Sequence, residues 1–176
     1  IPVTQLELMV EETNALILDT RNNADFSKGF IPQSINIGID GDFAPWVGAL
    51  IADVKQPIIL VTDNGREEET VTRLSRVGFD NLIGQLEGGF EAWKNAGHEI
   101  DTVNRISAEQ FAEKVKIGES KIIDVRKESE YEAEHVEEAY SKPLAYINEW
   151  VKDINPEEHF FLHCAGGYRS MIAASI

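Results

Sequence analysis

The sequence predicts an α/β fold in which helices flank parallel sheets, and it predicts two such units in tandem. Short apolar runs alternate with segments of helical character, which is the pattern of parallel strands joined by crossover helices. The same order of elements occurs twice, with a period of about 100 residues. The last apolar run meets the last helical segment at the one cysteine of the chain. We therefore expect units at 1–101 and 102–176, with a polar link at 101–105.

Composition limits the classes of partner. The chain has 176 residues, 43% of them hydrophobic, which suffices for one large or two small globular domains. Acidic residues outnumber basic ones by 31 to 16, and the net charge of -15 argues against nucleic acid and anionic membranes as partners. No apolar run approaches the roughly 18 residues that a membrane-spanning helix needs. Because one cysteine cannot form an intrachain disulfide, we expect a reducing, cytoplasmic compartment.

The first unit starts with a helix and continues with alternating strands and helices. Thr4 is the expected N-cap of a helix at 3–10, because its hydroxyl can accept a hydrogen bond from the first turn. The apolar run at 15–19 is typical of a buried parallel strand. The other expected elements are a helical turn at 24–29 that the segment 30–37 follows, a helix at 43–53, a strand at 57–62, a helix at 67–77, a strand at 81–84 and a helix at 88–97.

The second unit repeats the order and spacing of the first. The segment from Leu144 to Cys164 is as long as that from Phe43 to Asp63, which makes Cys164 and Asp63 equivalent positions. Both follow an expected strand, at the sheet edge where α/β folds bind ligands. The second copy has no counterpart of 81–97, so we expect this unit to be incomplete at its C-terminus. Further matching segments are 106–111 with 3–8, 121–126 with 16–21, and 135–139 with 30–34.

A strand-to-helix turn around Cys164 carries the clearest chemical signal. An apolar run at 159–162, which we expect to be a buried strand, leads into the stretch 163–170, and a helical segment follows. Two glycines allow a tight loop whose N–H groups point inward, next to the positive end of the helix. Such surroundings lower the pKa of a thiol, and Arg169 adds a fixed positive charge. The stretch predicts an anion-binding loop with a nucleophilic thiolate at its base.

The polar residues near this loop also have structural interpretations. A lone cysteine often belongs to the core, but within this loop we favour a reactive thiol. For Arg169 we favour contact with a bound anion over an ion pair at the start of the helix. For Tyr168, packing and substrate contact stay open alternatives. Three residues are interpreted as structural, namely His163 as a packed strand end and Asp124 with Arg126 as an ion pair.

The repeated pattern resembles the rhodanese family, which moves sulfane sulfur through a cysteine persulfide. The resemblance implies tandem rhodanese-like domains, each a central parallel sheet flanked by helices, and makes Cys164 the sulfur-accepting residue. It also implies that the following loop holds the persulfide, with Ala165, Gly166, Gly167, Tyr168 and Ser170 beside Arg169. The residues that carry the resemblance are 124–126, 135–144 and 164–170 in the second unit, and 19–21, 30–37, Gly88, Gly89, Trp93 and Gly97 in the first.

Loop length and content narrow the chemistry that the resemblance implies. Four residues separate Cys164 from Arg169, whereas related phosphatases use a loop one residue longer that has room for phosphate. The shorter loop suits a single sulfur atom. It lacks a second basic residue and the Gly-Val-Thr ending of the mercaptopyruvate-using branch. We therefore expect thiosulfate or a low-molecular-weight persulfide, such as glutathione persulfide, as sulfur donor and a thiol as acceptor, with no cofactor or metal.

The first unit departs from the family at the catalytic position. Asp63 replaces the cysteine, and a carboxylate cannot become a persulfide. The glutamates at 67–69 would repel an anionic donor. We interpret 1–101 as an inactive copy with a scaffold or docking role, and 102–176 as the active domain. A nucleophilic or metal-binding Asp63 is the less favoured alternative, because no His or Cys joins it.

Three functions stay open from the sequence. The leading hypothesis is a sulfurtransferase, and the second is a sulfur-carrier or interaction module of a larger persulfide-oxidising protein. The third is a cysteine-dependent phosphatase or arsenate reductase. The inactive–active order also resembles fusion proteins with a metallo-β-lactamase-like persulfide dioxygenase upstream, and a chain that starts at Ile1 fits that expectation. The sulfur donor, the acceptor and the oligomeric state, a homo-oligomer included, stay open.

Overall fold

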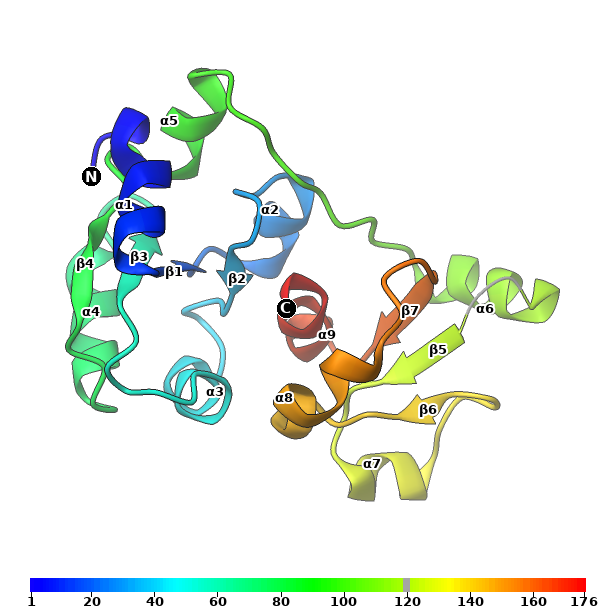
Figure 1. Ribbon diagram of the computed structural model, residues 1–176. Helices are drawn as coiled ribbons and strands as arrows, with labels where there is room; N and C mark the ends of the chain where they lie inside the picture. The colour runs from blue at the N-terminus through cyan, green and yellow to red at the C-terminus, as the bar shows by residue number, and fades with distance from the viewer. Residues whose placement is uncertain (119–120) are drawn as a thin grey trace. The chain divides into compact units, whose positions relative to one another are not determined.

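Two compact units make up the computed structural model, which describes residues 1–118 and 121–176. The first unit spans Ile1–Val103 and the second contains Asn104–Ala174 (Figure 1). Each unit is an α/β domain with a parallel sheet, so the predicted fold class is confirmed. No described helix is long and apolar enough to cross a membrane.

The first unit contains a four-stranded parallel sheet with the order β2-β1-β3-β4. Leu18 of β1 aligns with Ile35 of β2 and with Leu60 of β3, which fixes the register of the sheet. The elements in chain order are η1 (Val3–Gln5), α1 (Leu6–Thr13), β1 (Leu16–Asp19), α2 (Asn23–Lys28), β2 (Ile35–Asn36), α3 (Phe43–Leu50), β3 (Ile58–Val61), α4 (Glu67–Ser75), β4 (Leu82–Gln85) and α5 (Gly89–Asn95).

The core of the first unit covers both faces of this sheet. Successive strand residues point to opposite faces, so Ile17 and Leu18 of β1 are buried on different sides. On one face, Ile17 belongs to a cluster with Leu6 of α1 and Trp93 of α5. Burial on both faces explains why β1 and β3 are continuous apolar runs in the sequence.

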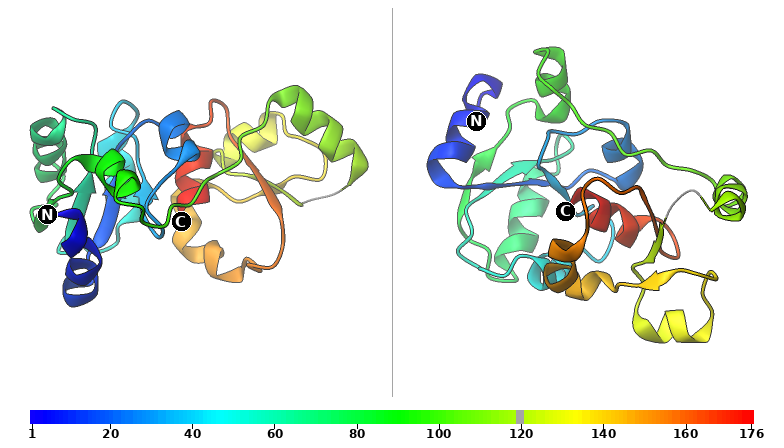
Figure 2. Two further views of the ribbon diagram at one scale, coloured as in Figure 1. Left: turned by 90° about the horizontal axis from the view of Figure 1, so that it is seen from above. Right: turned by 45° about the vertical axis from the view of Figure 1, so that its right-hand side comes forward.

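The second unit contains a three-stranded parallel sheet with the order β6-β5-β7 among the described residues. This order matches β2-β1-β3, so the duplication predicted from the sequence holds at the level of topology. The chain runs from β5 through α7 to β6, which is the yellow-green to yellow part of the ribbon in Figure 2. The elements are α6 (Ala108–Ile117), β5 (Lys121–Asp124), α7 (Glu128–Ala133), β6 (Tyr140–Ser141), η2 (Leu144–Tyr146), α8 (Ile147–Trp150), η3 (Val151–Asp153), β7 (Phe160–His163) and α9 (Tyr168–Ser175).

The start of the chain differs from the prediction. Thr4 lies inside the short helix η1, and α1 begins after Gln5 without a side-chain cap. The amino group of Ile1 donates to the Gln85 carbonyl at 2.6 Å, and the Ile1 carbonyl accepts from Glu87. These contacts with β4 and the turn after it hold the first residues, so Thr4 is not the N-cap.

Two further elements differ in extent or burial. The helix expected to reach residue 53 ends at Leu50, because Ile51 takes an extended backbone conformation. The strand expected to be buried before Cys164 is half-buried along its length, whereas β3 is fully buried. Strand β3 lies between β1 and β4, but β7 pairs with β5 alone among the described strands, which explains the difference.

Candidate functional site

The Cys164 loop joins β7 to α9 and surrounds the sulfur with donors. Gly167 has a φ of 88°, a left-handed conformation that favours glycine, and its N–H donates to Cys164 Sγ at 3.1 Å. The N–H of Ser170 donates to the same sulfur at 3.4 Å, and the Ser170 hydroxyl lies 3.5 Å from it. The loop therefore forms the predicted concave turn, with the start of a helix directed at the thiol.

These donors favour the charged form of the thiol. Burial acts against ionisation of Cys164, but hydrogen bonds from the Ser170 hydroxyl and from the N–H groups of Ser170, Gly166 and Gly167 outweigh it and lower the pKa. The thiolate is the nucleophilic form of cysteine. Cys164 is half-buried, whereas Ala165 and Gly166 are exposed, so the loop lies open to solvent.

Arg169 forms an ion pair with Glu130 of α7. Its Nη1 donates to Glu130 Oε2 at 2.6 Å, and its Nη2 donates to Oε1 at 3.0 Å. The hydrogen bonds from Arg169 hold the pKa of Glu130 at about 2, so the carboxylate is ionised at neutral pH. This is the ion-pair alternative weighed from the sequence, and contact of Arg169 with a bound anion stays a prediction.

Glu130 is the residue that sequence reasoning missed. It stands 39 residues from Arg169 in the chain, too far for a local pattern to join them. The sequence contained one weak indication of its importance, because an acidic residue precedes an aromatic one at matching positions of the two units, Asp25 in the first and Glu130 in the second. In the first unit, however, Asp25 pairs with Lys28 of its own helix at 2.9 Å.

Asp124 and Arg126 form the ion pair expected from the sequence. Arg126 Nη2 donates to Asp124 Oδ2 at 2.7 Å and to the Glu134 carbonyl at 2.8 Å, which ties the end of β5 to the end of α7. His163 Nε2 lies 3.5 Å from Asp124 Oδ2 without a hydrogen bond to a described residue, and burial lowers its pKa. The neutral imidazole fits a packed strand end.

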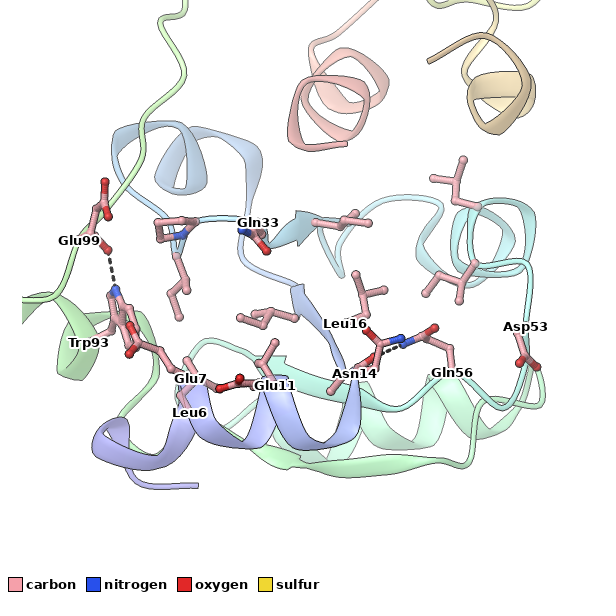
Figure 3. Close-up of a pocket in the computed structure, with 18 of the residues that line it drawn as sticks. Leu6, Glu7, Glu11, Asn14, Leu16, Gln33, Asp53, Gln56, Trp93 and Glu99 are labelled. Atoms are coloured by element: carbon pink, nitrogen blue, oxygen red, sulfur yellow. Dashed lines mark hydrogen bonds between the residues drawn. The ribbon is translucent and has the colours of Figure 1, made fainter. Parts of the chain in front are cut away.

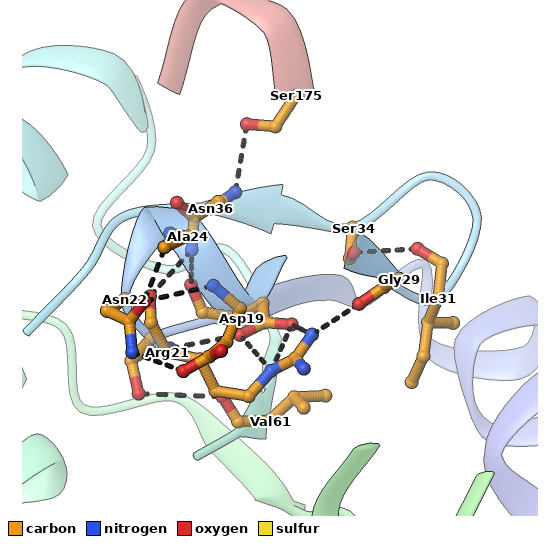
Figure 4. Close-up of polar contacts among 12 residues, drawn as sticks. Asp19, Arg21, Asn22, Ala24, Gly29, Ile31, Ser34, Asn36, Val61 and Ser175 are labelled. Atoms are coloured by element: carbon orange, nitrogen blue, oxygen red, sulfur yellow. Dashed lines mark hydrogen bonds and ion pairs between the residues drawn. The ribbon is translucent and has the colours of Figure 1, made fainter. Parts of the chain in front are cut away.

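The first unit repeats this ion pair at Asp19 and Arg21 (Figure 4). Arg21 Nη2 donates to Asp19 Oδ2 at 2.6 Å and to the Gly29 carbonyl at 3.0 Å. The side-chain amide of Asn36 joins the network by donating to the Asp19 and Arg21 carbonyls. Both units thus brace the carboxyl end of their first strand in the same way.

The sheet registers correct the predicted equivalence of Asp63 and Cys164. Val61 lies opposite Asp19 as His163 lies opposite Asp124, so Thr62, one residue before Asp63, takes the place of Cys164.

The surroundings of Asp63 also differ from those of Cys164. The Asp63 side chain is exposed, and Arg66 N–H donates to its carbonyl at 3.1 Å. Arg66 in turn pairs with Asp40 at 2.7 Å and with Glu69 at 2.8 Å. Among the residues that the structure describes, no group of three His, Cys, Asp or Glu is placed to hold a metal ion.

A cavity of about 730 Å³ opens in the first unit at the edge of the sheet where β1 begins, and no sequence motif predicted it (Figure 3). Its walls come from α1, the start of β1, residues 31–35, residues 50–56 and Trp93. Neither Thr62 nor Asp63 is among the lining residues, so the cavity is separate from the position equivalent to Cys164. All charged lining residues are acidic, namely Glu7, Glu11, Asp53 and Glu99.

Comparison with known proteins identifies the family to which the chain belongs. The rhodanese-like domain family matches residues 2–96 and 107–176, so the chain belongs to that family. The solution structure of the rhodanese-like domain of the Anabaena Alr3790 protein is similar over 61% of this chain and 83% of its own, with a TM-score of 0.51 and 22% identity, which concerns the fold alone.

Two curated relatives connect the chain to sulfur chemistry. The "Putative sulfur carrier protein YrkF" of Bacillus subtilis is 27% identical over 66% of this chain and 66% of its own length. The "Adenylyltransferase and sulfurtransferase MOCS3" of Drosophila grimshawi is 27% identical over 54% of this chain and 22% of its own length. The matched region is thus under two thirds of YrkF and about a fifth of MOCS3.

Proposed function

We propose that the chain is a sulfurtransferase that carries sulfane sulfur on Cys164. The observation that supports this most is the set of N–H donors around Cys164 Sγ, with the Ser170 hydroxyl beside them, together with the lowered thiol pKa. Membership of the rhodanese-like family and relatives named for sulfur transfer support the same reaction. The donor would be thiosulfate or a low-molecular-weight persulfide, and the acceptor a thiol.

The reaction proceeds in two nucleophilic steps. The Cys164 thiolate attacks the outer sulfur of the donor, and the bond from that sulfur to the rest of the donor breaks. With thiosulfate, the products are the Cys164 persulfide anion and sulfite. The N–H groups of Gly167 and Ser170 stabilise the anionic sulfur. An acceptor thiolate then attacks the outer sulfur and leaves as a persulfide, which regenerates the Cys164 thiolate.

The first unit takes no part in this chemistry in our proposal. Neither Thr62 nor Asp63 can carry sulfane sulfur, and the acidic first turn of α4 disfavours an anionic donor nearby. A scaffold or docking role for 1–101 remains our proposal, as does a metallo-β-lactamase-like domain upstream in the full protein.

Mass spectrometry tests the proposed function. After incubation with thiosulfate or glutathione persulfide, the chain should gain about 32 Da, the mass of one sulfur atom, and Cys164→Ser should not. Steady transfer of that sulfur to cyanide or a thiol is expected. Absence of the adduct, with release of phosphate from an aryl phosphate, would overturn the proposal in favour of a phosphatase.

A non-catalytic sulfur carrier is the second candidate. The name of the YrkF relative favours it, and the loop geometry around Cys164 would serve a carrier equally well. The same experiment separates the two functions, because a carrier forms the adduct but does not turn over with small thiols or cyanide.

A further inference from the structure

The charge beside the Cys164 loop is set by a residue outside the loop. Arg169 is the only basic residue within 164–170, and the Glu130 carboxylate contacts its guanidinium through two hydrogen bonds. The side chains of Arg169 and Glu130 are 18% and 34% exposed, so solvent screens the pair only in part. Glu130 therefore cancels most of the positive charge that Arg169 would otherwise present to a donor.

Other charged residues near the loop do not replace the positive charge of Arg169 that Glu130 cancels. Arg126 is occupied by Asp124 in a fork of hydrogen bonds. Glu128 and Glu134 lie on or next to α7 and add negative charge. The Cys164 thiolate and Arg126 both interact with Arg169 electrostatically, so Arg169 lies between two anions, with the paired Arg126 as the other nearby cation. Attraction for an incoming anion then comes from backbone N–H groups, which suit a single charged sulfur atom.

We propose that Glu130 is a specificity-determining residue that disfavours doubly charged sulfur donors, such as thiosulfate, relative to donors with one negative charge. The inference rests on the proposed function, because it concerns the donor of the same site. Glu130 acts through Arg169 and does not touch the reacting sulfur, so it is a positioning residue for charge.

A matched pair of donors tests the proposal on the intact chain. Thiosulfate carries two negative charges and methanethiosulfonate carries one, and both present a sulfane sulfur bound to an oxidised sulfur. The Cys164 thiolate takes the outer sulfur from each, and sulfite or methanesulfinate leaves with the bonding electron pair. Each step conserves charge and needs no oxidant or reductant.

The variant Glu130→Gln removes the charge and keeps an oxygen that can accept from Lys127 N–H, as Glu130 Oε2 does now. The repulsion between the Glu130 carboxylate and a donor is proportional to the charge of the donor. Its removal in Glu130→Gln should therefore raise kcat/KM about threefold for methanethiosulfonate and about tenfold for thiosulfate at low salt. The ratio of kcat/KM for thiosulfate to kcat/KM for methanethiosulfonate should approach the wild-type value at high salt, where charges are screened. Glu130→Asp, which keeps the charge, should retain the wild-type ratio.

Glu132→Gln is the control, because Glu132 lies on the same helix, is exposed, and loses the same formal charge. An unchanged donor ratio in Glu130→Gln, or an equal change in Glu132→Gln, overturns the inference. The salt dependence of the wild type tests it without any variant, since a fall in kcat/KM for thiosulfate with added salt would mean that the site attracts dianions. Absence of a sulfur adduct with every donor would instead contradict the proposed function.

Discussion

At the scale of single residues, Ser170 should set the reactivity of the thiol. Its hydroxyl and N–H both approach Cys164 Sγ, and both lower the thiol pKa. Ser170→Ala removes the hydroxyl alone, so the pKa of Cys164 should rise. The rate of alkylation by iodoacetamide should fall at neutral pH and match the wild type at a pH where both thiols are ionised. A pH–rate profile measures this, and Ser129→Ala, an exposed serine, should leave it unchanged.

Glu130 gives a second prediction at this scale, on stability. The folded-state pKa of Glu130 is about 2, below the model-compound value of 4.5, because Arg169 stabilises the carboxylate. A lowered carboxyl pKa adds stability that is fully present above pH 4.5 and disappears as the pH falls to about 2. The difference in thermal stability between wild type and Glu130→Gln should therefore be largest above about pH 5 and shrink towards pH 2. A difference that stays constant over this range would contradict the ion pair.

At the scale of elements, the two copies cap their first helices differently. Ser107 forms a capping box with Gln110 at the start of α6, whereas Thr4 makes no cap for η1. Ser107→Ala should cost about 1 kcal/mol of unfolding free energy, and Thr4→Ala should be nearly neutral. Denaturant unfolding of both variants measures the contrast. Equal losses of unfolding free energy in Ser107→Ala and Thr4→Ala would contradict this difference in capping.

The elements also show how far sequence reasoning reaches. Strands β1 and β3 were predictable because sheets buried on both faces demand apolar runs, and the repeat supplied the same pattern twice. The Cys164 turn was predictable because the glycines and the cysteine are adjacent in the chain. The Arg169–Glu130 pair was not predictable, because the chain has 31 acidic residues that could pair with Arg169. Only the packing of α7 against the loop brings Glu130 to it.

At the scale of the whole molecule, the first unit should fold by itself. It has a core of its own, in which Ile17, Phe90 and Trp93 are buried, and the bridge between Phe30 and Asp101 joins its last segment to the residues that follow α2. Residues 1–103 expressed alone should unfold in one cooperative transition and take up no sulfur from thiosulfate. Calorimetry and mass spectrometry check the two statements. A gradual, non-cooperative melt would mean that this unit depends on the rest of the chain.

The duplicated ion pair has an evolutionary consequence. Asp19–Arg21 and Asp124–Arg126 have the same geometry, although only one of the two units has a cysteine directly after the strand that pairs with its first strand. The brace therefore serves the architecture of the domain and outlasts its chemistry. After a duplication, one copy can drift in its loop while the strands beneath stay fixed. In our proposal the first unit is such a copy, and its loop is where a new role can be acquired without rebuilding the fold.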